Sequence, residues 1–395
     1  MKEFLEGSRA VAEAVKLCKP AVISAYPITP QTHIVEELAA MVAGGELNSQ
    51  FVNVESEHSA ASVVLGAEAT GVRAFTATSS QGLFYMAEVI FNIAGLRMPI
   101  VMTCANRAIS APINIWNDQQ DSISLRDAGW IQLYAQDVQE SADFHLIGYR
   151  IAEDKNIMLP VMVCMDGFIL THGMESVDIP EQAKVDKFLP PYKALYKLDT
   201  SDPMSIGLLV GPDHYLETRF ALQETLKDVL DLLPKISQEF RNAFGRDYKD
   251  CLVEEYCIKD AEKVIVAMGS VCGTIKEVVD ALRKKGKKVG LLRIISYRPF
   301  PYARIYDALK NVKRVAILDK AVSLGGYAPI AVDIKAAFSG KKKGPEVISS
   351  FVAGLGGRDI TVESIKEVFS KLTQKEVNGE FIDLKPELLK ESYGE

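Results

Sequence analysis

The stretch Ala21-Val22-Ile23-Ser24-Ala25-Tyr26-Pro27-Ile28-Thr29-Pro30 starts as a short apolar segment and continues as a turn with two prolines. The apolar run predicts a buried strand. Proline fixes its own φ and disfavours helix at the preceding residue, so Pro27 and Pro30 hold the backbone on both sides of Thr29. Taken alone, the turn is explained more simply by structure than by function. A strand, a rigid turn and a following helix are the repeating unit of an α/β fold.

The same order of strand, turn and helix recurs through the first half of the chain. Apolar runs predict strands at 21–25, 51–54, 74–78, 99–103 and 159–164. Helical apolar spacing predicts helices at 8–17, 32–42, 59–70 and 83–94. Strands that alternate with helices in this way favour a parallel sheet with helices on both faces. We therefore expect an α/β fold.

The character of the chain changes from about residue 174 to 256, where prolines interrupt the pattern and 215–244 predicts a long amphipathic helix or a pair of helices. A second α/β pattern starts at 264–268. A chain of 395 residues is also longer than one ordinary hydrophobic core requires. We expect a first domain at residues 1–245, with a connecting arm from about 175, and a second α/β domain at 258–395.

Composition restricts the class of protein. The chain has 48% hydrophobic and 25% charged residues, which is typical of a globular protein. Its formal net charge of −7 gives no electrostatic reason to expect nucleic acid or an anionic membrane as a partner. Residues 1–6 lack the apolar core of a signal peptide, and no run approaches the length of a membrane span. We expect a cytoplasmic protein.

The cysteines do not predict a metal site. They show no Cys-x-x-Cys spacing, whereas iron–sulfur clusters and structural zinc normally need several closely spaced thiolates. Cys251 and Cys257 could pair, but buried thiols are the favoured interpretation. We expect no metal bound by this chain. The six cysteines are Cys18, Cys104, Cys164, Cys251, Cys257 and Cys272.

Polar turns follow four of the predicted strands. They are Tyr26–Pro30, Val54–His58, Thr78–Gly82 and Cys104–Arg107. Open parallel sheets bind ligands beyond the carboxyl ends of their strands. These turns therefore define a candidate site, although any α/β domain has some polar turns.

Several residues of these turns have a simpler structural explanation. Glu55 and Glu57 lie near a predicted helix start, where carboxylates complement the helix dipole. His58 is better explained by local hydrogen bonding than by catalysis or metal binding, because no second ligand lies at useful spacing. Arg107 follows a buried strand and needs an anionic partner, which could be a structural aspartate or a substrate carboxylate.

Two further segments have features of a binding site. Residues 111–121 are rich in Asn and Asp and contain Trp116, which needs burial against something; they could form a binding loop or a surface Ω-loop. Residues 269–274 contain glycines, but lack the lysine of a phosphate loop. A tight turn between a strand and a helix is favoured there.

Taken together, these motifs resemble the α subunits of the 2-oxoacid:ferredoxin oxidoreductases, and most of all those of the pyruvate:ferredoxin oxidoreductases. The resemblance runs through nearly the whole chain in family order and is weakest at 185–255 and in the last twenty residues. The motifs are YPITP (26–30), VESEHSA (54–60), TATSSQGL (76–83), NRAISAPINIWNDQQD (106–121), DGFILTH (166–172), MGSVCGT (268–274), YRPFP (297–301) and AGLGGRD (353–359).

The resemblance implies a thiamine-diphosphate enzyme that cleaves a 2-oxoacid oxidatively with coenzyme A and ferredoxin. In this family the α chain supplies a pyrimidine-binding domain and a domain like the transketolase C-terminal domain. A β subunit holds Mg²⁺ and the diphosphate, and the further partners are a γ subunit and a ferredoxin-like subunit with iron–sulfur clusters. This chain indeed has no Gly-Asp-Gly, with which the Mg²⁺–diphosphate motif begins; the nearest match is Met165-Asp166-Gly167.

The resemblance also implies roles for single residues. Glu57 matches the glutamate that hydrogen-bonds N1′ of the cofactor's aminopyrimidine, with Glu55 as the competing candidate by position. Arg107 matches the arginine that binds the substrate carboxylate, and Thr29 the threonine near the reacting carbon. The implied catalytic residues are Glu57, Thr29 and Arg107. The implied cofactor contacts are Glu57, Tyr26, Pro27, Ile28, Ser80 and Gln81, and the implied substrate contacts are Thr29, Arg107 and Asn114.

Two alternatives stay open. The substrate could be another 2-oxoacid, such as a branched-chain acid, an aryl pyruvate or 2-oxoglutarate, although a second carboxylate would need another cation near Arg107 and none is obvious. The chain could also be a non-catalytic subunit that only completes an interface. The joint presence of Glu57, Thr29 and Arg107 argues against that second alternative.

Overall fold

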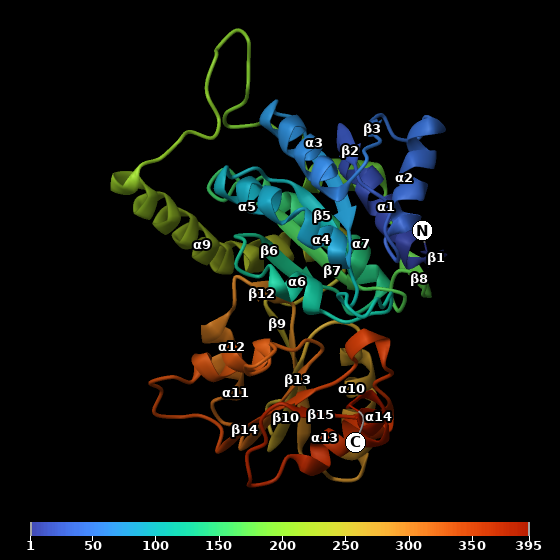
Figure 1. The fold of residues 1–395 in the computed structure, drawn as a ribbon, viewed down its shortest axis with the longest axis vertical. Coiled ribbons are helices and arrows are strands. Elements are labelled where there is room, and N and C mark those ends of the chain that lie inside the picture. Colours follow the sequence, from blue (N-terminus) through green and yellow to red (C-terminus); the bar gives the residue numbers. More distant parts are fainter. Residues whose placement is uncertain (1, 394–395) are drawn as a thin grey trace. The chain divides into compact units, whose positions relative to one another are not determined.

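The computed structural model describes residues 2–393 and separates into two compact units (Figure 1). The first unit comprises residues 1–254 with the short segments 268–270 and 294–301. The second comprises 255–267, 271–293 and 302–395. Both short segments lie in the range expected for the second domain, yet they pack with the first unit, because the chain returns to the first unit between its later strands.

The first unit contains a seven-stranded sheet in the order β12-β6-β7-β5-β4-β2-β3. All neighbouring strands are parallel except β12 and β6. The predicted parallel α/β sheet is confirmed. The strands are β2 (Val22–Ser24), β3 (Gln50–Val52), β4 (Ala74–Thr78), β5 (Val101–Asn106), β6 (Ile131–Tyr134), β7 (Val161–Asp166) and β12 (Ser296–Arg298).

Helices connect these strands close to the predicted positions. The one helix predicted at 83–94 is divided in two at Met86, and nothing in the local sequence marks this break. The helices are α1 (Gly7–Cys18), α2 (Thr32–Ala43), α3 (Glu57–Ala69), α4 (Ser80–Tyr85), α5 (Ala87–Gly95), α6 (Gln120–Ser124) and α7 (Val138–Ala152).

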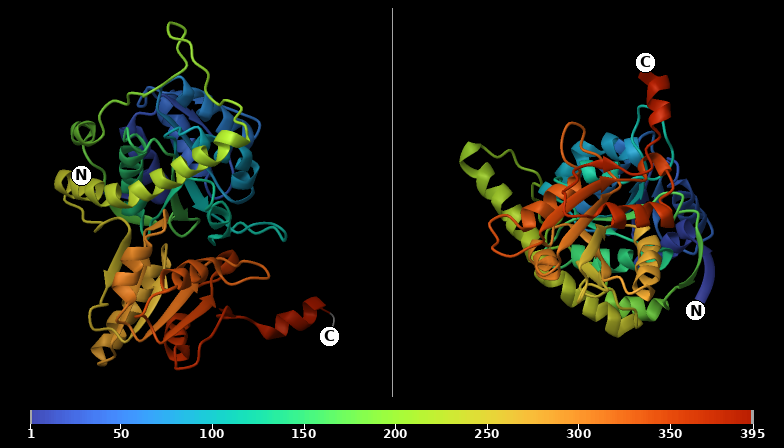
Figure 2. Two further views of the ribbon diagram at one scale, coloured as in Figure 1. Left: turned by 90° about the vertical axis from the view of Figure 1, so that its left-hand side faces the viewer. Right: turned by 90° about the horizontal axis from the view of Figure 1, so that it is seen from below.

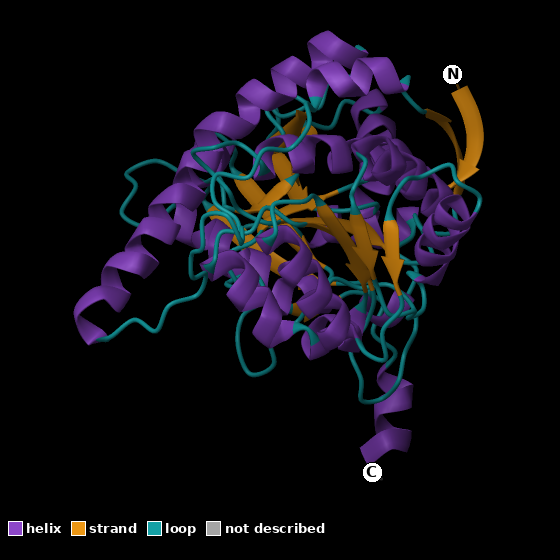
Figure 3. Cartoon of the chain, turned by 90° about the horizontal axis from the view of Figure 1, so that it is seen from above, coloured by secondary structure: helices purple, strands orange, loops and turns teal. Residues whose placement is uncertain are grey.

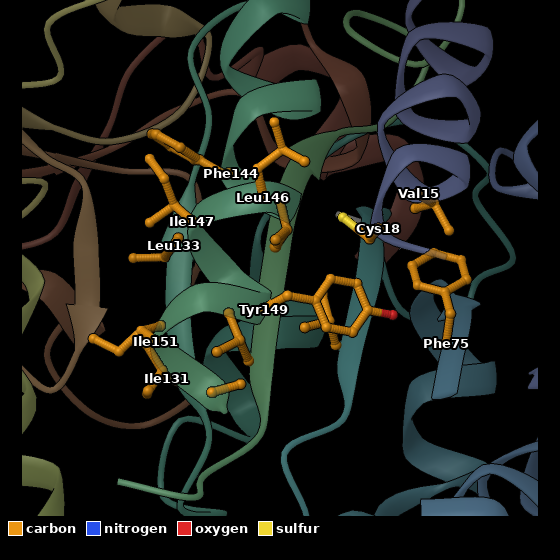
Figure 4. Packing of buried hydrophobic residues seen from close by; sticks show 14 of the residues in the cluster. Val15, Cys18, Phe75, Ile131, Leu133, Phe144, Leu146, Ile147, Tyr149 and Ile151 are labelled. Atoms are coloured by element: carbon orange, nitrogen blue, oxygen red, sulfur yellow. The ribbon is translucent and has the colours of Figure 1, made fainter. Parts of the chain in front are cut away.

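The core of the first unit lies where α1 and α7 pack on the sheet (Figure 4). Val15, Phe75, Ile147 and Tyr149 are fully buried there. Burying a side chain of this size is worth roughly 1.5–3 kcal/mol relative to leaving it in water. The Tyr149 hydroxyl donates a hydrogen bond of 2.9 Å to the carbonyl of Ala74, so the one polar group of the cluster is satisfied.

The segment expected to form a connecting arm packs largely into the first unit. Strand β8 (Met174–Asp178) pairs antiparallel with β1 (Lys2–Glu6), and α8 (Gln182–Phe188) follows. An exposed loop then leads to α9 (Pro212–Phe244), which is one helix of 33 residues rather than a pair (Figures 2 and 3). The apolar face of its second half is buried in the main core through Val229, Leu233, Ile236 and Phe240.

Within residues 2–393, no helix combines the length and the apolar character needed to cross a membrane. The longest helix, α9, is amphipathic and buries only one face.

The chain that follows α9 is fixed to α7 by a buried carboxylate. Asp143 is 1% exposed and accepts hydrogen bonds from Arg246 Nη2 at 2.7 Å and from the Tyr248 hydroxyl at 2.5 Å. Burial raises the pKa of Asp143, and the bonds from Arg246 oppose that shift. A buried charge of this kind is stable only while its partners stay in place.

The second unit contains a six-stranded sheet in the order β15-β14-β13-β10-β11-β9. The strand predicted at 264–268, where this unit's pattern was expected to start, is found as β10, one residue earlier. The strands are β9 (Val253–Tyr256), β10 (Lys263–Ala267), β11 (Val289–Ile294), β13 (Arg314–Asp319), β14 (Val347–Val352) and β15 (Glu380–Phe381). The helices are α10 (Val271–Lys284), α11 (Tyr302–Leu309), α12 (Pro329–Ala337), η1 (Leu355–Gly357), α13 (Val362–Lys371) and α14 (Pro386–Tyr393).

All six cysteines are free thiols, and Cys251 and Cys257 are not paired. Five are buried, and Cys257 is partly buried. The interpretation of these residues as buried thiols therefore fits the structure.

Candidate active site

The four polar turns lie at one edge of the first sheet. Strands β5, β4, β2 and β3 are consecutive neighbours and all run in the same direction. Their carboxyl ends therefore meet at the same edge, where open α/β sheets form their ligand crevice. Figure 1 labels β2, β3 and β5 of this sheet together with α3 and α4.

Glu57 is a buried carboxylate at the start of α3. Ser56 caps this helix, because its hydroxyl accepts a hydrogen bond of 3.2 Å from the Ser59 amide. Glu55 is exposed and bonds to the Ser59 hydroxyl. Glu57 itself is only 8% exposed, and no hydrogen bond or ion pair to its carboxylate is found within residues 2–393. The simple capping explanation therefore applies to Ser56 and leaves the Glu57 carboxylate without a partner.

Gly82 allows Glu57 to approach the turn after β4. A Cβ atom at Gly82 would lie 2.7 Å from Glu57 Oε1 and 2.5 Å from Thr78 Oγ1. The hydroxyls of Thr78 and Ser79 are also buried without a hydrogen-bond partner among the residues that the structure describes. Buried polar groups normally have partners. The unsatisfied groups around Gly82 therefore fit a polar ligand that this chain does not supply.

Ser80 has an unusual backbone conformation. Its φ is +49°, in the left-handed region that residues other than glycine rarely adopt. Its amide donates to Asp121, and its hydroxyl oxygen lies 2.5 Å from the Ala108 carbonyl oxygen and 2.6 Å from the side-chain oxygen of Gln81, so its one hydrogen is within reach of both acceptors. Strained residues of this kind cluster at functional sites.

The Arg107 side chain reaches from the turn after β5 to the turn after β2. Its Nη1 donates to the Thr29 carbonyl and its Nε to the Asn114 carbonyl, each at 2.9 Å. Burial lowers the pKa of Arg107, and the nearby Asp121 opposes that shift. An arginine stays charged in a protein. The hydrogen bond between Arg107 and Asp121 comes from the main-chain amide of Arg107, so the guanidinium has no carboxylate partner within the described residues.

The proline turn after β2 is tied to the sheet by Gln31. The Gln31 side chain donates to the Ala77 carbonyl at 2.7 Å and accepts from the Ile28 amide at 3.3 Å. Tyr26, Pro27 and Thr29 are exposed on this turn, Ile28 is partly buried and Pro30 is buried. The structure thus brings Thr29 and Arg107 together, with Thr29 joined through its carbonyl group.

The segment 111–121 has an exposed first half and a largely buried second half. Ile113 and Trp116 are 79% and 53% exposed, so Trp116 is not buried by this chain. Trp116 lies 6.1 Å from Phe168 between ring centroids, and its amide donates to Asn114 Oδ1. The second half, residues 117–121, is largely buried and polar. The exposed half is a surface loop, and the buried half belongs to the site.

Two groups of possible metal ligands have other partners. Asp166, from the nearest match to the magnesium motif, accepts hydrogen bonds from the Ser270 amide at 2.9 Å and the Ser270 hydroxyl at 2.5 Å. Elsewhere in the described part of the chain, ligand atoms of Glu6, His33 and His172 lie within 4.8 Å of one another. Of these, His33 Nδ1 forms a 2.7 Å hydrogen bond with Glu6.

Sequence reasoning missed two residues that organise the site. Gly82 was treated as part of a polar turn, and its contact with Glu57 appears only when β3 and β4 are placed in the sheet. Asp121 was the last residue of a motif, and no pattern signalled that it is fully buried. The only available signal was the density of polar residues at 117–121.

The family described as "Pyruvate flavodoxin/ferredoxin oxidoreductase, thiamine diP-bdg" matches residues 13–237, which are more than half of the chain. The family described as "Pyruvate:ferredoxin oxidoreductase core domain II" matches residues 261–365. The fold and these matches define the class: this is an α/β protein of the thiamine-diphosphate-binding oxidoreductases.

Full-length relatives define the family more closely. "Pyruvate synthase subunit PorA" of Methanothermobacter thermautotrophicus is 49% identical over 385 residues, which cover 98% of this chain and 99% of the relative. "Ketoisovalerate oxidoreductase subunit VorA" of Pyrococcus abyssi is 42% identical over 369 residues, covering 93% of this chain and 92% of the relative. The chain belongs to the pyruvate synthase PorA family, the α subunits of pyruvate:ferredoxin oxidoreductases.

Solved structures share the fold. A 2-oxoglutarate:ferredoxin oxidoreductase from Magnetococcus marinus aligns with a TM-score of 0.74 at 21% identity, over 94% of this chain and 65% of that one. A split-gene transketolase aligns with a TM-score of 0.55 at 11% identity, over 94% of this chain and 98% of that one. At these identities the likeness concerns the fold alone.

The contact between Gly82 and Glu57 generates a prediction. A Gly82→Ala substitution places a methyl group 2.7 Å from Glu57 Oε1, so the carboxylate must move. We expect the complete complex to bind thiamine diphosphate roughly tenfold or more weakly, as for the loss of a buried charged hydrogen bond. Calorimetric titration of the cofactor-free complex measures this.

Gly66→Ala in α3 is the matched control, because nothing lies within 4 Å of the added methyl group. It should leave cofactor affinity unchanged and stabilise the helix by about 0.5–1 kcal/mol. Cofactor binding by the Gly82→Ala complex that equals the wild type would show that Glu57 does not depend on this glycine.

Proposed function

We propose that this chain supplies one half of a thiamine-diphosphate site that oxidatively decarboxylates pyruvate. With coenzyme A as acyl acceptor, the products are acetyl-CoA, CO₂ and reduced ferredoxin, and the reaction is reversible. The observation that carries the proposal is the buried Glu57 carboxylate, which lacks a partner in the chain and lies beside the equally unpaired hydroxyl of Thr78. A ring with polar nitrogen atoms would satisfy both groups.

In this proposal Glu57 holds the aminopyrimidine. Bound thiamine diphosphate supplies the electron sink for decarboxylation. A buried carboxylate against ring atom N1′ shares a proton with that nitrogen rather than standing as a free charge. Glu57 thereby sets the protonation of the ring and promotes loss of the proton at C2. Glu55 is exposed and bonded to Ser59, so it is the weaker candidate.

The turns on either side provide the remaining cofactor contacts. Ser80 and Gln81 start α4 next to Gly82, and Tyr26, Pro27 and Ile28 form the proline turn after β2. Both turns are rigid: Ser80 is held by hydrogen bonds from its amide and its hydroxyl, and Gln31 ties the proline turn to β4. Rigid turns suit a cofactor ring, because a preorganised site loses little entropy on binding.

Arg107 binds the substrate carboxylate in this proposal. Its guanidinium is fixed by the carbonyls of Thr29 and Asn114, has unused N–H groups, and has no carboxylate partner in the described residues. A 2-oxoacid carboxylate supplies that missing charge. The exposed hydroxyl of Thr29 then lies near the reacting carbon, and Asn114 contributes to the substrate pocket from its loop.

The rest of the site belongs to partner chains. We propose that a β subunit holds Mg²⁺ and the diphosphate, because this chain has no Gly-Asp-Gly and Asp166 is already hydrogen-bonded to Ser270. Iron–sulfur clusters belong to a ferredoxin-like subunit, since five of the six cysteines here are buried and none has Cys-x-x-Cys spacing. A γ subunit completes the complex. We place it in the cytoplasm with its soluble reactants, coenzyme A and ferredoxin.

A branched-chain 2-oxoacid is the second candidate substrate. It is favoured by the VorA relative, which is 42% identical and is named for ketoisovalerate. The residues proposed here recognise the carboxylate and keto groups, which all 2-oxoacids share. The choice between side chains therefore depends on pocket walls, some of them on partner chains.

The test of this function is a substrate panel. The purified complex is assayed with coenzyme A and a low-potential dye on pyruvate, 3-methyl-2-oxobutanoate, phenylpyruvate and 2-oxoglutarate. We expect the highest kcat/KM for pyruvate. A higher value for 3-methyl-2-oxobutanoate would support the second candidate, and no turnover of any 2-oxoacid would contradict the proposed function.

Glu57→Gln tests the cofactor role. The amide cannot share a proton with N1′, so we expect kcat of the reconstituted complex to fall about 10²- to 10⁴-fold. Exchange of the C2 proton of bound cofactor with deuterium, followed by NMR, should slow in parallel. Glu55→Gln, at an exposed position, is the control and should behave as wild type. Full turnover by the Glu57 variant together with its partner chains would remove the assignment.

Arg107→Ala tests substrate binding. Removing the guanidinium should raise KM for pyruvate about 10- to 100-fold and slow decarboxylation, because a charge-assisted hydrogen bond is lost. Arg150→Ala is the matched control: Arg150 lies on α7 and pairs with Glu239 at 3.0 Å. An unchanged kcat/KM in the Arg107 variant would assign the anion-binding role to another residue.

A further inference from the structure

Asp121 is a fully buried carboxylate in the first turn of α6. Its Oδ2 accepts the main-chain amides of Ser80 at 3.0 Å and Arg107 at 2.9 Å. Its Oδ1 accepts Asn106 Nδ2 at 2.8 Å and the Ser122 amide at 2.7 Å. One side chain thus receives four N–H groups from three separate segments.

Two of these segments are turns of the proposed site. Ser80 follows β4 and Arg107 follows β5, and these strands are parallel neighbours in the sheet. The Ser80 hydroxyl also donates to the carbonyl of Ala108, the residue after Arg107. Asp121 and this hydroxyl therefore fasten the two turns to each other at the edge where ligands bind.

The Ser80 turn needs such support. Its φ of +49° is unfavourable for a residue with a side chain, so the surrounding contacts must maintain it. The amide of this strained residue points to Asp121. Loss of the carboxylate would leave the Ser80 and Arg107 amides without partners, and the backbone would then be free to relax.

The surroundings of Asp121 fit its ionised form. All four of these hydrogen-bond partners are N–H donors, and the Cys104 thiol, a weak donor, lies with its Sγ 3.8 Å from Oδ2. A carboxylate has the four lone-pair sites that this arrangement requires, and a protonated acid or an amide does not. Burial raises the pKa of Asp121 to about 6, with the hydrogen bonds opposing the shift, so the carboxylate is charged near neutral pH.

Three titratable groups around Asp121 do not change charge in the same range. Arg107 stays a cation. The pKa of the Cys104 thiol on β5 is raised well above its ordinary value by its hydrogen bond with Cys164 on β7 and by burial, and burial raises the pKa of the Tyr134 hydroxyl on β6 well above its ordinary value. Below about pH 6 Asp121 is therefore the group in this cluster that gains a proton.

We propose that Asp121 is a positioning residue: as a carboxylate, it holds the Ser80 turn and the Arg107 main chain in the arrangement that binds cofactor and substrate. It acts through these residues and touches neither ligand. The expected effect on catalysis rests on the proposed function. The hydrogen-bonded link between the two turns does not, because it can be tested without measuring turnover.

The test is Asp121→Asn in the complete complex. The amide keeps the shape of the side chain but turns an NH₂ group toward two donors. We expect KM for pyruvate to rise about tenfold or more, with KM for coenzyme A unchanged. In the wild-type complex kcat/KM should decrease as the pH falls through about 6, because Asp121 is protonated in this range. This decrease should be absent from the variant.

Hydrogen exchange gives a readout that is independent of activity. Peptides that contain Ser80 and Arg107 should exchange faster in the variant than in the wild type. If the variant does not assemble, the wild-type complex alone tests the proposal. After correction for intrinsic exchange rates, the protection of these peptides should decrease when the pH is lowered below about 6. The Ser59 amide, which is bonded to the neutral Ser56 hydroxyl, is the internal control.

Asp143→Asn separates positioning from general stability, because Asp143 is equally buried but bonds to Arg246 and Tyr248. It should lower stability without raising KM for pyruvate. The proposal is overturned if the Asp121 variant keeps the wild-type KM for pyruvate and the wild-type pH profile, or if KM for pyruvate changes equally in the Asp121→Asn and Asp143→Asn variants. It is also overturned if the hydrogen-exchange protection of the peptides with Ser80 and Arg107 is independent of pH. Absence of turnover in the wild-type complex would overturn only the proposed function.

Discussion

Parallel pairing of β3, β2, β4 and β5 is the constraint on which the rest of the site depends. It brings the carboxyl ends of four strands to one edge, so that short turns from distant parts of the sequence become neighbours. A single side chain can then cross from one turn to another, as Arg107 does to reach the Thr29 carbonyl. Cross-connections of this kind make the edge rigid.

The same edge carries polar groups that the chain leaves unsatisfied. The side chains of Glu57, Thr78 and Ser79 are buried without hydrogen-bond partners in the described residues, whereas the main-chain amides of Ser80 and Arg107 are both bonded to Asp121. Unpaired buried groups cost folding free energy. These unpaired groups lie beside turns that are held rigidly by hydrogen bonds. We expect this arrangement in one half of a shared site, where a ligand bound together with a second chain supplies the missing partners.

The sequence predicted the order of strands and helices and the four polar turns, because apolar periodicity and prolines are local signals. It also favoured Glu57 over Glu55, and the role of Glu57 stays a prediction. The spatial strand order could not be read from chain order, so neither the contact of Gly82 with Glu57 nor the link through Asp121 was foreseen. The arm expected from about residue 175 was counted within the first domain, but its apolar stripe alone could not show that α9 packs into the main core of that unit.

The central claim is that this chain binds only the aminopyrimidine end of a cofactor shared with another subunit. An experimental structure of the complete complex with thiamine diphosphate and pyruvate tests this most directly. The account predicts Glu57 within hydrogen-bond distance of N1′, Arg107 on the substrate carboxylate, and the diphosphate with Mg²⁺ held by the partner. A cofactor bound wholly by one chain, or with Glu57 remote from the ring, would contradict it.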